Sequence, residues 1–179
     1  GLTNLRVRYI AINPVNSNIL FAGSENGLFR SENGGNSWSP VNNGLTNPYI
    51  QAIQIDPKTR TTIYVGTSSG VFKSIDNGDI WVLKNSGLTH SYVQTIAIDP
   101  IEPNVLYAGD GSNGGVSKST DGGENWHELN TGLTCKYVKY LTVNPLTPSI
   151  VYAATQGGGV YQIDQVELSF QLFLPTVLR

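Results

Sequence analysis

GLTNPYIQAIQIDPKTRTTIYVGTSSGVFKSIDNGDIWVLKNS, residues 44–86, is one copy of a segment that occurs four times in the chain. Each copy opens with Gly-Leu-Thr, at Gly1, Gly44, Gly87 and Gly132, so the period is 43, 43 and 45 residues. A repeat of this size that contains several short strands and no helical pattern is typical of propeller blades, small sheets that bury their faces only by stacking on neighbours. The sequence therefore predicts an all-β, propeller-type array of four four-stranded blades.

Each copy divides into four predicted strands. The first alternates apolar and polar residues and ends before Asn-Pro or Asp-Pro, because proline cannot donate to a strand ladder; its copies are Val7–Ile12, Ile50–Ile55, Val93–Ile98 and Val138–Val143. A second apolar run closes in a turn such as Asn26-Gly27 or Ser69-Gly70. The third strand follows, and the fourth is expected to carry a tryptophan. We expect one propeller unit over residues 1–179, with blades at about 1–43, 44–86, 87–131 and 132–174 and a tail at 175–179.

Composition excludes several classes of function. The 11 basic and 13 acidic side chains leave a net charge of -2, so we exclude binding to nucleic acid or to anionic membranes. No apolar run approaches the roughly 20 residues that span a bilayer. Cys135 stands alone, so no intramolecular disulfide is expected. The chain has neither an initiating Met nor a signal sequence and looks processed, and we expect it to be extracellular or on the cell surface.

A motif of the form Ser-x-Asp/Asn-x-Gly-x-x-Trp lies between the third and fourth strands. The short Asp or Asn side chain can accept backbone N–H bonds across a tight turn, Gly tolerates positive φ, and Trp can anchor the hairpin between sheets. We therefore predict a structural role for all three copies, with the three tryptophans as buried anchors. The copies occur in phase: Ser31, Asn33, Gly35 and Trp38; Ser74, Asp76, Gly78 and Trp81; and Ser119, Asp121, Gly123 and Trp126.

These motif residues resemble the Asp-box, or BNR, repeat found in sialidases, in sortilin-type receptor domains, in some plant-polysaccharide hydrolases and in photosystem assembly propellers. Sialidases with this repeat use three arginines around a carboxylate, with a Tyr/Glu nucleophile pair and an Asp acid. This chain has only Arg6, Arg8, Arg30, Arg60 and Arg179, and Arg30 stands where other copies carry Lys73 and Lys118. The sequence therefore predicts no arginine triad.

Other chemical sites are not predicted either. Asp56 and Asp99 stand in the strand-ending turns that Asn13 and Asn144 occupy in the other copies, which indicates turn chemistry. Asp110 is the only acid in a distinctive loop, residues 109–115, which we expect to be flexible and to offer too few oxygen ligands for calcium. The two histidines, at different points of the repeat, show no zinc spacing. We expect no catalytic residue, no metal and no cofactor.

One row of side chains suggests binding. Six residues before each strand-ending proline lies a polar residue, Arg8, Gln51, Gln94 or Lys139, preceded two positions earlier by Arg6, Tyr49, Tyr92 or Tyr137. The innermost strands of a propeller face its central channel, so these residues are expected to form a polar and aromatic ring near one mouth. Such a ring suits contact with a carbohydrate or a peptide, although the walls of a wet channel are polar in any case.

The fourth copy departs from the pattern. Ile163, Gln165 and Glu167 occupy the motif positions of Ser, Asp and Gly, and Phe170 replaces Trp, as is common in a terminal repeat. Its alternating segment 168–174, with Leu168, Phe170, Leu172 and Leu174, is a candidate assembly strand. Because the propellers that the chain resembles generally have six or more blades, we expect open blade faces and association with other copies, as a closed ring or a filament.

The sequence thus favours a non-catalytic extracellular repeat protein that acts as a binding or structural module. Two alternatives remain open: a fragment of a larger Asp-box glycoside hydrolase whose missing blades hold the carboxylates, and a propeller that assists protein assembly.

Overall fold

The computed structural model describes residues 1–2, 6–165 and 169–173, and over these residues the chain folds into four four-stranded antiparallel sheets. Each sheet contains the four strands of one repeat, paired in chain order. Blade 1 contains β1 (Val7–Ile12), β2 (Leu20–Ser24), β3 (Gly27–Ser31) and β4 (Ser39–Pro40); blade 2 contains β5 (Ile50–Ile55), β6 (Ile63–Thr67), β7 (Gly70–Ser74) and β8 (Val82–Leu83). Blade 3 contains β9 (Val93–Ile98), β10 (Leu106–Asp110), β11 (Gly115–Ser119) and β12 (His127–Glu128); blade 4 contains β13 (Val138–Val143), β14 (Ile150–Thr155), β15 (Gly159–Asp164) and β16 (Ser169–Phe173). The predicted all-β array of four blades is confirmed.

The first strand of every blade has the predicted bounds, and the turn after it is capped by an Asp or Asn side chain. Asp56 Oδ1 accepts the backbone N–H groups of Lys58 at 2.7 Å and Thr59 at 3.0 Å. Asn13, Asp99 and Asn144 cap their turns in the same way. This local bond reverses the chain after the first strand and leads it into the second.

The Asp-box turns connect the third strand to a fourth strand of only two residues in blades 1–3. In blade 2, Asp76 Oδ1 accepts the Ser74 hydroxyl at 2.7 Å and the Ile80 N–H at 3.0 Å, and the Gly78 N–H donates to Ser74 Oγ at 2.8 Å. Each box is thus closed by bonds within its own turn. The tryptophan expected on the fourth strand lies just before it.

The boxes of blades 1 and 3 repeat this geometry with different surroundings. Asn33 replaces the aspartate in blade 1: its Oδ1 accepts the Ser31 hydroxyl at 3.1 Å and the Ser37 N–H at 2.8 Å. Asn33 is exposed, so it acts in the turn through these local bonds and not through burial in a core. In blade 3 the Gly123 N–H donates to Ser119 Oγ at 2.9 Å, and Gly123 itself is buried.

The box glycines are required by their backbone conformation. Gly35, Gly78 and Gly123 have φ angles of 90°, 91° and 87°, a region that favours glycine. Space is not the constraint at Gly123, because a Cβ built there would lie 3.5 Å from the Tyr64 ring, at ordinary contact distance.

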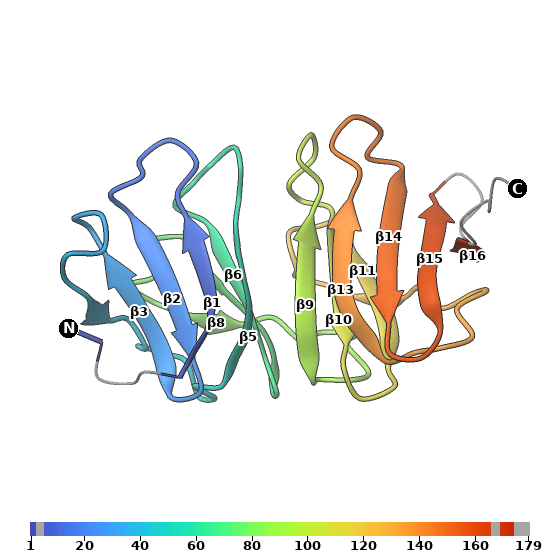
Figure 1. Cartoon of the computed structure of the whole chain (residues 1–179), viewed down its shortest axis with the longest axis horizontal. Helices are drawn as coiled ribbons and strands as arrows, with labels where there is room; N and C mark the ends of the chain where they lie inside the picture. Colours follow the sequence, from blue (N-terminus) through green and yellow to red (C-terminus); the bar gives the residue numbers. More distant parts are fainter. Residues whose placement is uncertain (3–5, 166–168, 174–179) are drawn as a thin grey trace, which may run out of the picture.

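The core lies between blades. One apolar cluster joins blades 1 and 2, a second joins blades 2 and 3, and a third joins blades 3 and 4. Contacts between first strands follow the same order, from β1 to β5, β9 and β13. In Figure 1 the blades follow one another from the N-terminal side to the C-terminal side, with β3 and β16 at opposite sides of the view. The blades therefore form an open array, in which blades 1 and 4 are the two ends.

The predicted burial of the three tryptophans is correct for two of them and wrong for Trp38. Trp81 and Trp126 are buried, and their indole N–H groups donate to the backbone oxygens of Val41 and Lys84 in the preceding blade. Trp38 is only partly buried and donates to Gly35 O in its own turn. The box tryptophan thus anchors a blade to the one before it, and among the described residues no blade precedes blade 1.

None of the described residues forms a helix that is long and apolar enough to cross a membrane.

Candidate functional site

The polar row, which consists of Arg8, Gln51, Gln94 and Lys139 with the residues two positions before each, lies at one end of the blades. Val7, at the start of β1, pairs with Ser24 at the end of β2, where the hairpin to β3 begins. The turns between second and third strands therefore lie at this end of the blades. The proline turns and the Asp boxes lie at the opposite end, where β1 finishes and β2 starts.

At the boundary between blades 1 and 2, side chains of the row are in direct contact. The Arg8 guanidinium lies 5.0 Å from the centroid of the Tyr49 ring, within the range of a cation–π contact. Glu25, in the β2–β3 turn, accepts Arg8 Nη2 at 2.9 Å and Arg6 Nη1 at 3.1 Å. These hydrogen bonds, chiefly that from Arg8, lower the pKa of the Glu25 carboxyl. The carboxylate is therefore held in its charged form beside the two arginines.

Side chains of the row are also in contact at the boundary between blades 2 and 3. Gln51 is buried, and its Nε2 donates to the Tyr92 hydroxyl at 2.7 Å. Gln94 Nε2 donates to Gln51 Oε1 at 3.4 Å, so the side chains of both blades form one hydrogen-bonded chain. Direct side-chain contacts thus link the row across two of the three boundaries between blades. The row ends at Tyr137 and Lys139 of blade 4, and both side chains are exposed.

Loop 110–115 borders the row in blade 3. The Gly111 N–H donates to Tyr92 O at 3.1 Å, and a Cβ on Gly111 would lie 2.8 Å from the Tyr92 ring, so glycine permits this close approach. Asp110 is buried, and its Oδ1 accepts the Ser112 N–H, the Ser112 hydroxyl and the Gly114 N–H at 2.7–2.9 Å. Asp110 is therefore the cap of this loop. Sequence reasoning singled out the loop but missed this role, which the spacing Asp-x-Ser-x-Gly indicates.

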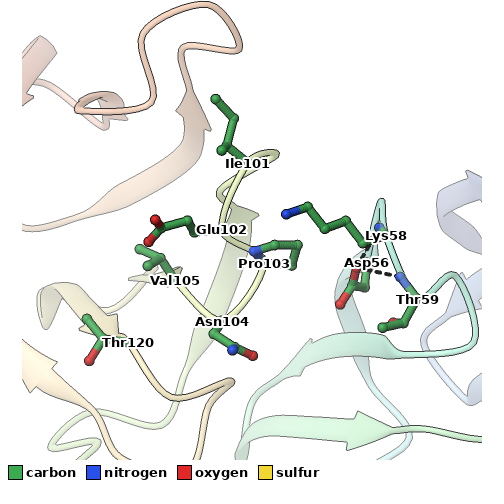
Figure 2. Close-up of a pocket in the computed structure, with 9 residues that line it drawn as sticks. All are labelled: Asp56, Lys58, Thr59, Ile101, Glu102, Pro103, Asn104, Val105 and Thr120. Atoms are coloured by element: carbon green, nitrogen blue, oxygen red, sulfur yellow. Dashed lines mark hydrogen bonds between the residues drawn. The ribbon is translucent and has the colours of Figure 1, made fainter.

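A separate cavity of about 440 Å³ lies at the opposite end, between the proline turns of blades 2 and 3. Figure 2 shows its two carboxylates, Asp56 and Glu102, on separate turns with Pro103 between them. Asp56 is engaged with the backbone of its own turn, as described above, and Glu102 is exposed. Among the described residues, no three His, Cys, Asp or Glu side chains gather as a metal site would require.

The candidate assembly strand is partly described. Leu168 and Leu174 lie outside the described residues, as does Glu167. The backbone of β16 pairs with β15, with Phe170 opposite Ile163 and Leu172 opposite Tyr161. The segment therefore serves as the fourth strand of its own blade, and Leu172 is exposed at its surface.

Comparison with known proteins agrees with this architecture. The family model described as Sortilin, neurotensin receptor 3 (Sortilin-Vps10) matches residues 26–139, more than half of the chain. No curated protein matches the chain.

Solved structures share the fold. An ancestral GH74 enzyme superposes with a TM-score of 0.80 at 22% identity over 96% of this chain and 24% of its own. The GH74 xyloglucanase from Xanthomonas campestris gives 0.76 at 15% identity over 93% of this chain and 30% of its own. The extracellular domain of a hybrid two-component system from B. thetaiotaomicron gives 0.78 at 14% identity, over 98% and 25%. The chain thus spans between about a quarter and a third of the length of these structures. The three in-phase boxes, the four blades and the match over residues 26–139 together show that this chain belongs to the Asp-box propeller family of Sortilin-Vps10.

Proposed function

We propose that the chain is a non-catalytic, extracellular propeller module that binds a glycan through the polar row. The observation that carries the proposal is the continuity of the row from Arg8 and Tyr49 through Gln51 and Tyr92. Contacts between blades hold these side chains in fixed positions, and preorganised groups lose little conformational freedom when a ligand binds.

A glycan suits this row because of its chemistry. Tyrosine rings offer a flat apolar face to the C–H groups of a sugar and a hydroxyl at the rim. Amide side chains both donate and accept hydrogen bonds, as sugar hydroxyls require. The xyloglucanase among the structures with this fold acts on xyloglucan, as its name states, and this supports xyloglucan oligosaccharides as the first probe.

The carboxylates near the row support binding without hydrolysis. Glycoside hydrolysis uses two carboxyl groups about 5–10 Å apart across the scissile bond. Glu25 is held by two arginines, and Asp110 Oδ1 is engaged by its own loop. Hydrogen bonds from the two arginines lower the pKa of Glu25, which is the opposite of what a general acid needs.

A second candidate function has its own observation. Because the chain superposes on about a quarter of the ancestral GH74 enzyme, it also fits as four blades of a larger hydrolase whose acid and base lie on other blades. In that case the row would be part of a substrate cleft. The two proposals differ in the full-length protein: only the second requires two facing carboxylates in blades outside residues 1–179.

Isothermal titration with xyloglucan oligosaccharides tests the glycan proposal. The test variant is Tyr137→Ala combined with Lys139→Ala, because both side chains are exposed at the end of the row. The control is Tyr140→Ala, which removes an exposed tyrosine within β13. Its counterparts Ala52 and Thr95 are buried next to the following blade. We expect the double variant to bind at least about tenfold more weakly, equivalent to about 1.4 kcal/mol. Equal binding by all three proteins, or none by the parent, would contradict the proposal.

Tyr92 is a less suitable target for this test. Because the Tyr92 hydroxyl is the acceptor for the buried Gln51 amide, its loss also leaves a buried donor unpaired.

A further inference from the structure

The three interfaces between blades depend on a glycine in the second strand of the earlier blade. A Cβ built on Gly23 would lie 2.5 Å from Ile50 Cγ2 of the next blade. The same construction on Gly66 meets Val93 Cγ1 at 2.8 Å, and on Gly109 it meets Val138 Cγ1 at 2.6 Å. These distances are too short for two carbon atoms, so each first strand sits where a side chain on the preceding blade would stand.

Blade 1 carries the side chains of such an interface, and within the part of the chain that the structure describes no blade packs against them. Val7, Ile10 and Ile12 are 40%, 62% and 55% exposed. The counterparts of Val7 and Ile10 in blades 2–4 are at most 7% exposed: Ile50 and Ile53, Val93 and Ile96, and Val138 and Leu141. Trp38, in the position of the buried Trp81, lies on the same side and is only partly buried. We call this surface, Val7, Ile10, Ile12 and Trp38, the blade 1 face.

The opposite end of the array does not match this face. Ala154 pairs with Tyr140 as Gly23 pairs with Tyr9, so Ala154 holds the position of the three interface glycines. Its methyl group stands where the incoming Val7 side chain of another copy would have to lie. Val7 is β-branched and stiff about χ1, so it cannot easily turn away.

We propose that the blade 1 face docks an Asp-box blade that carries glycine at the position of Ala154, and that the Ala154 methyl group prevents the chain's own blade 4 from filling this role. The partner is thus defined by its second strand, in which a glycine follows two positions after an aromatic residue, as Gly23 follows Phe21 and Gly66 follows Tyr64. The predicted ring or filament of identical chains would require the same contact between blades 4 and 1, so we expect that contact to be weak in the native chain. This inference is independent of the proposed glycan site.

A mixing experiment tests the inference with variants of the chain itself. The acceptor is the double variant Ala154→Gly with Ile10→Asp, which has a glycine-bearing blade 4 and a charged, blocked blade 1 face. The control carries Ile10→Asp alone. Each is mixed with the parent chain, whose blade 1 face is free, and the complexes are measured by sedimentation velocity. We expect a 1:1 complex with the double variant and at least a tenfold weaker one with the control.

Three further measurements keep the test decisive. Ala154→Gly alone should associate with itself, whereas Ala154→Ser, which keeps a side chain at this position, should behave like the parent. Thermal unfolding establishes that each variant is folded; should Ala154→Gly fail to fold, Val7→Ala removes the clash from the other side and should also increase self-association. Equal complex formation by acceptor and control, or no complex with either, would overturn the proposal.

Discussion

Replacement of Trp81 by alanine should destabilise the protein far more than replacement of Trp38, although both tryptophans occupy the same motif position. Trp81 is 3% exposed, packs in the cluster between blades 1 and 2, and donates to Val41 O at 2.9 Å. Truncation of a buried aromatic side chain costs about 3–5 kcal/mol, because apolar burial is lost and a cavity remains. Trp38 is partly exposed and bonds only within its own turn, so its loss should cost about 1 kcal/mol, as for an average substitution.

Thermal unfolding followed by circular dichroism measures the difference. For a chain of this length, 1 kcal/mol shifts the midpoint by roughly 2–4 °C. Trp81→Ala should therefore melt about 6–20 °C below the parent, and Trp38→Ala within about 4 °C of it. If the two variants melt at the same temperature, or Trp81→Ala melts like the parent, the box tryptophan does not act as an anchor to the preceding blade.

Three other outcomes are expected. Hydrogen bonds from Asn125 lower the pKa of Asp121 to about 2, so its contribution to stability is complete above about pH 4 and is lost as the pH falls to about 2. In Asp121→Asn the urea midpoint of unfolding should therefore depend less on pH between about 4 and 2, and the same pH dependence as in the parent would contradict the assignment. Gly66→Ala should lower the thermal midpoint, since its Cβ would lie 2.8 Å from both Val93 Cγ1 and Val93 O, whereas a neutral result would mean that blades 2 and 3 can separate at no cost. Incubation with sialosides, β-glucans or xyloglucan should release no sugar above a buffer control, and turnover abolished by Asp110→Ala would show that the chain is an enzyme.

Local patterns in the sequence were sufficient to predict the strands and turns. Alternation from Val7 to Ile12 and the following Asn-Pro define β1, because both the period of two and the missing proline donor act within a few residues. The Asp boxes were predictable for the same reason: Ser74, Asp76 and Gly78 bond to one another and to their own turn.

Contacts between blades could not be predicted in the same way. The burial of a box tryptophan depends on the presence of an earlier blade, which the motif around Trp38 does not encode. The sequence indicates which residues make up the polar row. The bond from Gln51 to Tyr92, in contrast, depends on how the sheets of blades 2 and 3 are offset from one another. The steric effect of the Ala154 methyl group likewise follows only from the close approach of Gly23 to Ile50 in the structure.

The central claim is that the polar row, and not the cavity between the proline turns, is the ligand site. Backbone amide chemical shifts recorded during titration with xyloglucan oligosaccharides test it most directly. We predict saturable shifts around Tyr92, Gln94 and Tyr137, with the amides of Asp56 and Glu102 at the other end of the blades unchanged. Shifts confined to Asp56, Glu102 and their turns, or no saturable shifts at the row, would contradict the claim.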